Sequence, residues 1–334
     1  MWLESGLSRR ALLGSSLTIA ALAAAPVLAR GADPLPSWND GANKRAILDY
    51  VRRITSKGGA DYVAPEARIA TFDNDGTLWC ETPLIEGEFV KLRMGEMLKA
   101  NPALAQEEPY KTLLSGKDSA IETMPVQDLL KVFVDTHTGM TEAAFAVMVA
   151  DFFKTARHPK YKVPYTQVVY QPMIELLALL RANGFTNHLC SGGEVSFMRV
   201  ISEPLYAIPQ QYVIGTIIKD TAVEGADGKL ELMRTGPMLL FNDTNSKVVG
   251  IQYEMGLHPV FVAGNVRSGG DIGQMRWSRQ GALPSLQLMV NHDDAVREAA
   301  YSEPKGESLA ASAKYGFNVV SMKDDWKRIF AFQS

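Results

Sequence analysis

A chain of 334 residues, 46% of them hydrophobic, can bury a full core as one large domain or as a domain with a sizeable insertion. Its formal net charge of −3, with lysines and arginines scattered along the chain, gives no electrostatic footprint for nucleic acid. The sequence contains no internal repeat or low-complexity tract, which excludes solenoids and long disordered tails.

Residues 1–29 have the features of an export signal peptide. Arg9 and Arg10 precede an uncharged, Ala-rich stretch that ends at Ala29, where small residues suit a signal peptidase. An uncleaved membrane anchor is the alternative, although Gly, Ser, Thr and Pro residues dilute the apolar run. We expect the twin-arginine export machinery to deliver a periplasmic or secreted protein, cleaved near Ala29, with no stable membrane association afterwards.

Residues 30–66 predict a helical extension ahead of the main fold. Apolar residues recur at helical spacing between Trp38 and Ile54, and Gly58 and Gly59 then break the pattern. Residues 68–72 are a short apolar run that fits a buried strand and stops at Asp73.

Residues 82–165 differ from the strand-like segments on either side. Prolines divide this block into several helices, and Phe145, Met148 and Phe152 recur at helical spacing. We interpret the block as an inserted α-helical cap whose Met and Phe side chains form its own core.

Strands and helices alternate in the remainder of the chain. The predicted strands cover residues 185–190, 211–219, 226–234, 258–264 and 286–290, and the predicted helices include residues 171–184, 191–201 and 247–256. This alternation predicts an α/β fold, a Rossmann-like doubly wound parallel sheet, with its core in residues 67–81 and 166–334.

Short polar clusters follow several of the predicted strands. They are residues 73–75, 191–193, 265–271 and 292–294. Because ligands bind at the carboxyl ends of the strands in open sheets of this kind, these clusters predict an active site. We expect Asp293 and Asp294 to be helix caps.

Residues 73–78, DNDGTL, match the first signature of the haloacid dehalogenase-like superfamily, D-x-D-G-T-[LV], in its phosphatase branch. The later signatures of this superfamily resemble Ser191 after a strand, Lys247 at a helix start, and Asn265 followed by Asp271. The whole pattern is most similar to the phosphoserine phosphatase-like members. It covers roughly residues 67–290 and implies a core interrupted by the cap.

The resemblance implies a phosphomonoesterase acting on a small phosphorylated metabolite. Asp73 would be the nucleophile that forms an aspartyl-phosphate, and Asp75 would be the general acid and base, which requires a raised pKa. Gly76 would allow the tight turn that aims both groups, and Thr77 would help to hold the turn and the phosphate.

The resemblance also implies Mg²⁺ as cofactor, bound by the Asp73 carboxylate, the Asp75 backbone carbonyl and Asp271. The superfamily has two acidic residues, four or five apart, after a glycine. Here Asn265 takes the first place and Asp271 follows six residues later. Asn265 can supply an oxygen to the metal but no charge.

The phosphate group would bind to the Ser191 hydroxyl, the backbone N–H of Gly192 at the opening of a helix, and Lys247. Glu81 and Arg267 are possible substrate contacts. Two alternatives remain, namely a dehalogenase-type hydrolase of the same fold and a non-catalytic periplasmic protein that binds phosphate esters. The cysteines Cys80 and Cys190 could form a disulfide, but we favour two buried free thiols.

Overall fold

The computed structural model describes residues 33–115, 123–267 and 269–333. Residues Pro34–Ser334 belong to one unit of the chain, whose fold is given below. The predicted export signal, residues 1–29, lies outside the described residues. Among the residues described, no helix is both long enough and apolar enough to cross a membrane.

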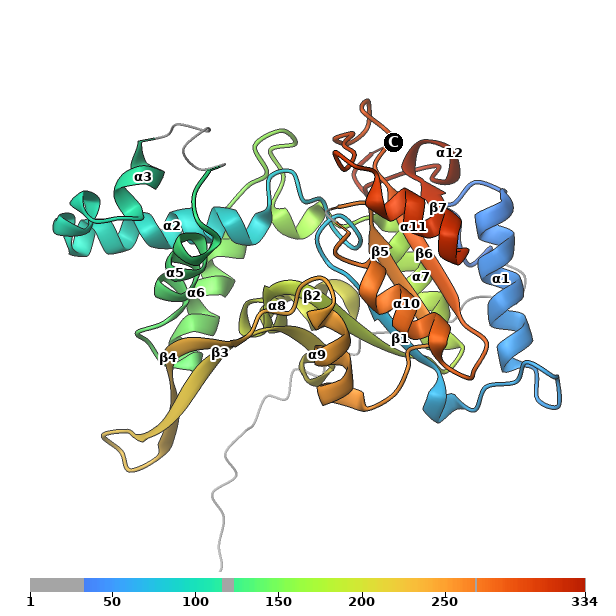
Figure 1. The fold of residues 1–334 in the computed structure, drawn as a ribbon, viewed down its shortest axis with the longest axis horizontal. Coiled ribbons are helices and arrows are strands. Elements are labelled where there is room, and N and C mark those ends of the chain that lie inside the picture. The colour runs from blue at the N-terminus through green and yellow to red at the C-terminus, as the bar shows by residue number, and fades with distance from the viewer. Residues whose placement is uncertain (1–32, 116–122, 268, 334) are drawn as a thin grey trace, which may run out of the picture. The chain divides into compact units, whose positions relative to one another are not determined.

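A sheet of seven strands in the order β4-β3-β2-β1-β5-β6-β7 forms the centre of the fold (Figure 1). Neighbouring strands are parallel except for β3 and β4, which form an antiparallel hairpin at one edge. The strands are β1 (Ile69–Phe72), β2 (Thr186–Glu194), β3 (Val213–Glu224), β4 (Leu230–Leu240), β5 (Phe261–Asn265), β6 (Leu286–Asn291) and β7 (Asn318–Ser321). The strand order reverses direction between β1 and β5, which places a crevice for ligands at their carboxyl ends.

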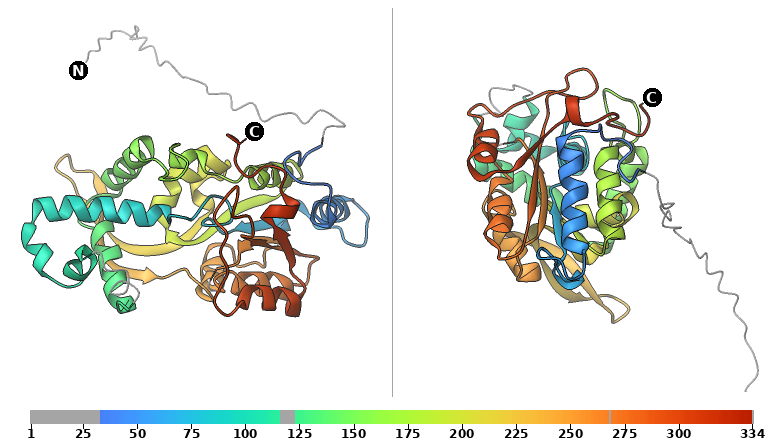
Figure 2. Two further views of the ribbon diagram at one scale, coloured as in Figure 1. Left: turned by 90° about the horizontal axis from the view of Figure 1, so that it is seen from above. Right: turned by 90° about the vertical axis from the view of Figure 1, so that its right-hand side faces the viewer.

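Helices cover both faces of the sheet, so the predicted α/β doubly wound fold is confirmed. Figure 2 (right) shows the orange and red helices α10 and α11 on one side of the strands and the green helix α7 on the other. The helices outside residues 82–165 are α1 (Ala42–Thr55), α7 (Gln171–Ala182), α8 (Val195–Tyr206), α9 (Ser246–Met255), α10 (Ile272–Gln280), α11 (Glu307–Tyr315) and α12 (Met322–Asp325). Because both faces are covered, strands such as β1 and β5 are buried along their whole length.

The described residues of the predicted cap, 82–115 and 123–165, are largely helical, as predicted, and aromatic side chains pack around Phe89. The rings of Phe145, Phe152 and Phe197 lie 5.7, 5.6 and 5.3 Å from the Phe89 ring, between centroids. Because Phe197 belongs to α8, the helical segment shares one apolar core with the sheet. The predicted domain boundaries of this segment stay predictions. Its helices within the described residues are α2 (Ile85–Ala100), α3 (Tyr110–Leu114), α5 (Val126–His137) and α6 (Glu142–Thr155).

The β3–β4 hairpin fixes the helical segment to the sheet through Arg234, whose side chain is fully buried. Its guanidinium donates to the backbone carbonyl of His137 (2.6 Å) and pairs with the Glu194 carboxylate (2.9 Å). It also pairs with Glu142 of α6 and lies over the ring of Phe145. Since the charge of a buried arginine must be matched by acceptors, this contact holds α5, α6 and the end of β2 together.

The prediction that a strand stops at Cys190 and a helix opens at Gly192 is wrong. Strand β2 continues through Ser191 to Glu194, so no helix opens at Gly192, and α8 begins only at Val195. The pairing of β2 with β3 shifts register between Cys190 and Glu194, as the two glycines there allow, and the Glu194 side chain then caps α8.

The two aspartates after β6 differ: the Asp293 carboxylate accepts a hydrogen bond from the backbone N–H of Lys323 (3.0 Å), in the first turn of α12 (Met322–Asp325), whereas Asp294 caps no helix. Asp294 accepts hydrogen bonds from the backbone N–H groups of Val296 (3.1 Å) and Arg297 (3.0 Å) within a turn. In the described part of the chain the next helix begins only at Glu307. The prediction of free thiols is confirmed, because Cys80 and Cys190 are both buried and unbridged.

Candidate active site

The turn after β1 brings two carboxylates to the end of the strand. The backbone carbonyl of Asn74 accepts hydrogen bonds from the N–H groups of Thr77 (3.1 Å) and Leu78 (2.8 Å), which closes the turn. Gly76 has φ +71°, and a Cβ there would lie 1.9 Å from Nδ2 of Asn265. Only glycine fits this position, both for its backbone conformation and for its close approach to β5.

Lys247 lies between two carboxylates, that of Asp73 directly after β1 and that of Asp271 at the start of α10. Its Nζ lies 2.7 Å from Oδ1 of Asp73 and 2.6 Å from Oδ1 of Asp271, and all three side chains are buried. Gln274 donates to the same Asp271 oxygen at 2.7 Å. A Cβ at Gly264 would lie 2.4 Å from Cγ of Asp271, so glycine is required there for the carboxylate to reach the lysine.

The opposite charges of Lys247 and its two carboxylate partners change the pKa values of Lys247 and Asp73. Burial opposes the charged lysine, but the carboxylates of Asp271 and Asp73 outweigh it and raise the pKa of Lys247. Burial and the neighbouring Asp271 raise the pKa of Asp73, while Lys247 acts in the opposite direction. A bound cation next to Asp73 would further favour the ionised form that a nucleophile needs.

Asp75 has the environment of a general acid. Burial raises the pKa of its carboxyl group, although a hydrogen bond from Nε1 of Trp79 to Oδ1 (2.9 Å) opposes the shift. The protonated carboxyl can give a proton to a leaving group and then accept one from water. Burial therefore raises the pKa of both aspartates, and the two differ in their partners, which are Lys247 for Asp73 and Trp79 for Asp75.

A cavity of about 340 Å³ unites the predicted site residues. Those that line it are Asp73, Asp75, Glu81, Ser191, Gly192, Lys247, Asn265, Arg267 and Asp271. Thr77 does not line it. The Thr77 side chain is fully buried, and its hydroxyl has no hydrogen-bond partner in the described residues.

Oxygen atoms at the strand ends fit a magnesium ion. The Asp73 carboxylate and the Asn265 amide line the same cavity, and Oδ1 of Asn265 accepts no hydrogen bond within the described ranges. These are hard oxygen ligands of the kind that Mg²⁺ prefers. Asp271 differs, since Lys247, Gln274 and the backbone N–H of Asn265 already bind its two oxygens. No cluster of three His, Cys, Asp or Glu side chains suited to a metal occurs in the described residues.

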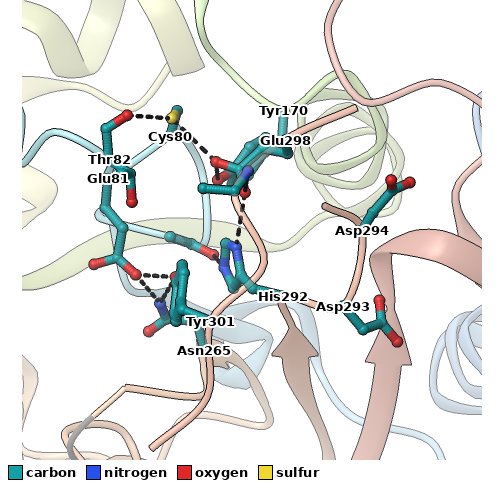
Figure 3. Close-up of polar contacts among 12 residues, drawn as sticks. Cys80, Glu81, Thr82, Tyr170, Asn265, His292, Asp293, Asp294, Glu298 and Tyr301 are labelled. Atoms are coloured by element: carbon teal, nitrogen blue, oxygen red, sulfur yellow. Dashed lines mark hydrogen bonds and ion pairs between the residues drawn. The ribbon is translucent and has the colours of Figure 1, made fainter. Parts of the chain in front are cut away.

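Glu81 lies at the centre of a polar group that the sequence identified only in part (Figure 3). Its Oε1 accepts hydrogen bonds from Asn265 Nδ2 (2.9 Å) and from the Tyr301 hydroxyl, and its Oε2 pairs with Arg267 (2.7 Å). Burial raises the pKa of Glu81 to about 8 even though Arg267 opposes the change. Tyr301 was missed because nothing in its local sequence marks it.

His292, which directly follows β6, stabilises the turn after β1. One ring nitrogen, Nε2, donates to the backbone carbonyl of Gly76 at 2.8 Å, and Nδ1 lies 3.3 Å from the Glu298 carboxylate. Glu298 also accepts from Cys80 Sγ (3.1 Å) and Tyr170 OH (3.2 Å). Burial would raise the pKa of Glu298, but the contact with His292 and the other donors lower it overall. The sequence marked residues 292–294 but assigned His292 no role.

Glu86, at the start of α2, lines the same cavity and is buried. Both of its carboxylate oxygens accept from the backbone N–H of Glu194, and Oε1 lies 3.3 Å from Nε2 of His137. Burial raises the pKa of Glu86 to about 8 and lowers that of His137 to about 4. At neutral pH Glu86 is therefore mainly protonated and His137 mainly unprotonated.

Glu86 should make the protein less stable as the pH rises. Its folded pKa of about 8 exceeds the ordinary 4.5, so the folded state holds the proton more tightly, and the free energy of unfolding falls as pH rises through this interval. Glu86→Gln, which imitates the protonated acid, should remove this part of the fall. Urea unfolding at pH 5 and pH 8 measures it, with Glu96→Gln on the exposed face of α2 as control. An unchanged pH dependence in Glu86→Gln would contradict the prediction.

Comparisons with known proteins give a likeness of fold only. The chain matches no protein-family model and no curated protein. Among solved structures it is similar to a functionally unknown protein from Anaerococcus prevotii, at 15% identity over 84% of this chain and 91% of the other, with a TM-score of 0.47. It is also similar to a protein of unknown function from Bordetella pertussis (16%, 76% and 97%, TM-score 0.47). A phosphoserine phosphohydrolase-like protein from Francisella tularensis is a third match (16%, 76% and 94%, TM-score 0.38).

Proposed function

We propose that the chain is a magnesium-dependent phosphomonoesterase of the haloacid dehalogenase-like type. The observation that carries the proposal is the Lys247 ammonium, which joins Asp73 and Asp271 beside Asp75 and Ser191 in one cavity. A phosphoryl group brings negative charge toward a carboxylate nucleophile, so transfer requires a fixed cation at this place.

The reaction proceeds in two displacements. An oxygen of the Asp73 carboxylate attacks phosphorus, the bond from phosphorus to the ester oxygen breaks, and Asp75 gives its proton to the leaving alkoxide. Water then attacks the phosphorus of the aspartyl-phosphate while Asp75 removes a proton from it. The bond from phosphorus to Asp73 breaks, which releases inorganic phosphate and restores the carboxylate.

Other residues of the cavity hold the phosphoryl group. The Ser191 hydroxyl and the Gly192 backbone N–H contact its oxygens, and Lys247 offsets the charge that develops on them. Mg²⁺, when held by the Asp73 carboxylate, the Asp75 carbonyl and Asn265, supplies positive charge against the same oxygens. Asp271 keeps Lys247 in place.

The size of the cavity, about 340 Å³, supports a small phosphate monoester as substrate. We propose a phosphorylated small metabolite met outside the cytoplasm, because Arg9, Arg10 and the Ala-rich stretch after them favour export. The export machinery would then be the only macromolecular partner that this proposal requires.

Phosphate release from p-nitrophenyl phosphate tests the proposal. We expect release that EDTA abolishes and Mg²⁺ restores. A dehalogenase would instead release halide from a 2-haloacid without a metal, and a binding protein would bind phosphate esters without any release. Release that is indifferent to EDTA would overturn the magnesium-dependent reading.

A further inference from the structure

Asn265 is the last residue of β5. An aspartate at this position would present two equivalent oxygens to a cation. An amide presents two different atoms, and only its oxygen can bind a cation, because the NH₂ group is a donor. The orientation of this one side chain therefore determines whether Asn265 can serve as a ligand. A device that fixes the orientation is needed with asparagine and is unnecessary with aspartate.

Two acceptors hold the nitrogen of this amide. Nδ2 of Asn265 donates to Oε1 of Glu81 (2.9 Å) and to the hydroxyl oxygen of Tyr301 (3.1 Å). The Tyr301 hydroxyl gives its own proton to Glu81, so its lone pairs are available to the amide. Both N–H bonds of the amide are thereby used, and Oδ1 is left on the opposite side, without a hydrogen bond from the described residues.

The two acceptors are themselves fixed. Arg267 binds the second oxygen of Glu81 at 2.7 Å, which fixes the direction of the carboxyl group and leaves Oε1 facing Asn265. The Tyr301 ring stacks on His292, with centroids 4.2 Å apart and planes at 21°, and His292 is held by Glu298 and the Gly76 carbonyl. Figure 3 shows Glu81, Tyr301 and Asn265 converging from three separate segments.

We infer that Glu81 and Tyr301 are positioning residues that turn the oxygen of Asn265 toward a divalent cation. The inference rests on the proposed function, since it needs a cation beside Asp73. It assigns a role to the Glu81–Tyr301 pair other than contact with substrate. It also explains how the chain can use a neutral amide where a carboxylate would bind the cation in either orientation.

The test measures Mn²⁺ binding by electron paramagnetic resonance on the full chain, without substrate. Tyr301→Phe removes one acceptor and should raise the Mn²⁺ dissociation constant roughly 10- to 100-fold, the usual effect of losing a partner that orients a ligand. Tyr315→Phe, on α11, is the matched control and should leave binding unchanged. Urea unfolding of both variants checks that the protein remains folded.

A second pair of variants separates loss of amide orientation from a general weakening of the metal site. In Glu81→Gln with Asn265→Asp the donor and acceptor are exchanged, and a carboxylate needs no orientation. Tyr301→Phe should therefore change the dissociation constant by less than about twofold in this background. Equal weakening in both backgrounds, or none in the Asn265 protein, overturns the inference.

The outcomes also separate the inference from the proposed function. If the unmodified protein binds Mn²⁺ and hydrolyses p-nitrophenyl phosphate with Mg²⁺, but Tyr301→Phe binds Mn²⁺ normally, only the inference fails. If the unmodified protein binds no Mn²⁺ and its hydrolysis ignores EDTA, both fail.

Discussion

Asp73→Asn should lower kcat for p-nitrophenyl phosphate by at least about 10³-fold, because it removes the nucleophile. The amide keeps the shape of the side chain, and its oxygen can still accept from Lys247, which lies 2.7 Å from Oδ1 in the unmodified protein. The variant should therefore fold and should lose the chemical step alone. Initial rates of phosphate release, with unfolding curves for both proteins, measure the effect.

The control for Asp73 is another ion-paired aspartate outside the cavity. Asp49 on α1 lies 2.5 Å from Arg52 and is half exposed, so Asp49→Asn should leave kcat unchanged. Full activity in Asp73→Asn would refute an aspartyl-phosphate mechanism. If Asp49→Asn also abolished activity, the loss in Asp73→Asn could not be assigned to the nucleophile, because any aspartate substitution would then disturb the fold.

Lys247→Met should lower the free energy of unfolding by about 3–5 kcal/mol. Methionine fills a similar volume but leaves the carboxylates of Asp73 and Asp271 buried without their shared cation. Activity should disappear as well, because the positive charge beside the phosphoryl group is lost. Urea unfolding in the presence of EDTA measures the change in unfolding free energy without a contribution from bound metal.

A surface lysine provides the contrast. Lys154 pairs with Asp151 at 2.8 Å while both side chains are mostly exposed, so Lys154→Met should cost no more than about 1 kcal/mol. If Lys247→Met were as mild as Lys154→Met, the two buried carboxylates could not both be charged in the folded protein. The role of Lys247 as their common partner would then be wrong.

The sequence predicted the parts of the site that follow from strand order. Asp73 and Asn265 each end a short apolar run, and parallel strands bring such ends to one edge. Lys247, at a helix start, was assigned through its resemblance to the third signature of the superfamily, and the structure adds its bridge to Asp73 and Asp271. The order of strands and helices along the sequence is enough to predict which strand ends and helix starts lie close together.

Contacts between irregular segments were beyond this kind of prediction. Tyr301 meets Glu81 across 220 positions, from a loop without periodicity that could mark its direction. Strand β7 and helix α12 are short and were not predicted. A strand was predicted over residues 185–190 with a helix after it, whereas β2 continues to Glu194, because the two glycines permit a register shift there.

Gly76 and Gly264 have a consequence for anyone who would transplant this site into another scaffold. A Cβ at Gly76 would lie 1.9 Å from the Asn265 side chain, and one at Gly264 would lie 2.4 Å from the Asp271 side chain. Copying only the acids and the lysine onto new strands would therefore fail, since any larger residue at either position would push an essential side chain aside. The smallest portable unit of this chemistry includes two residues that have no side chain at all.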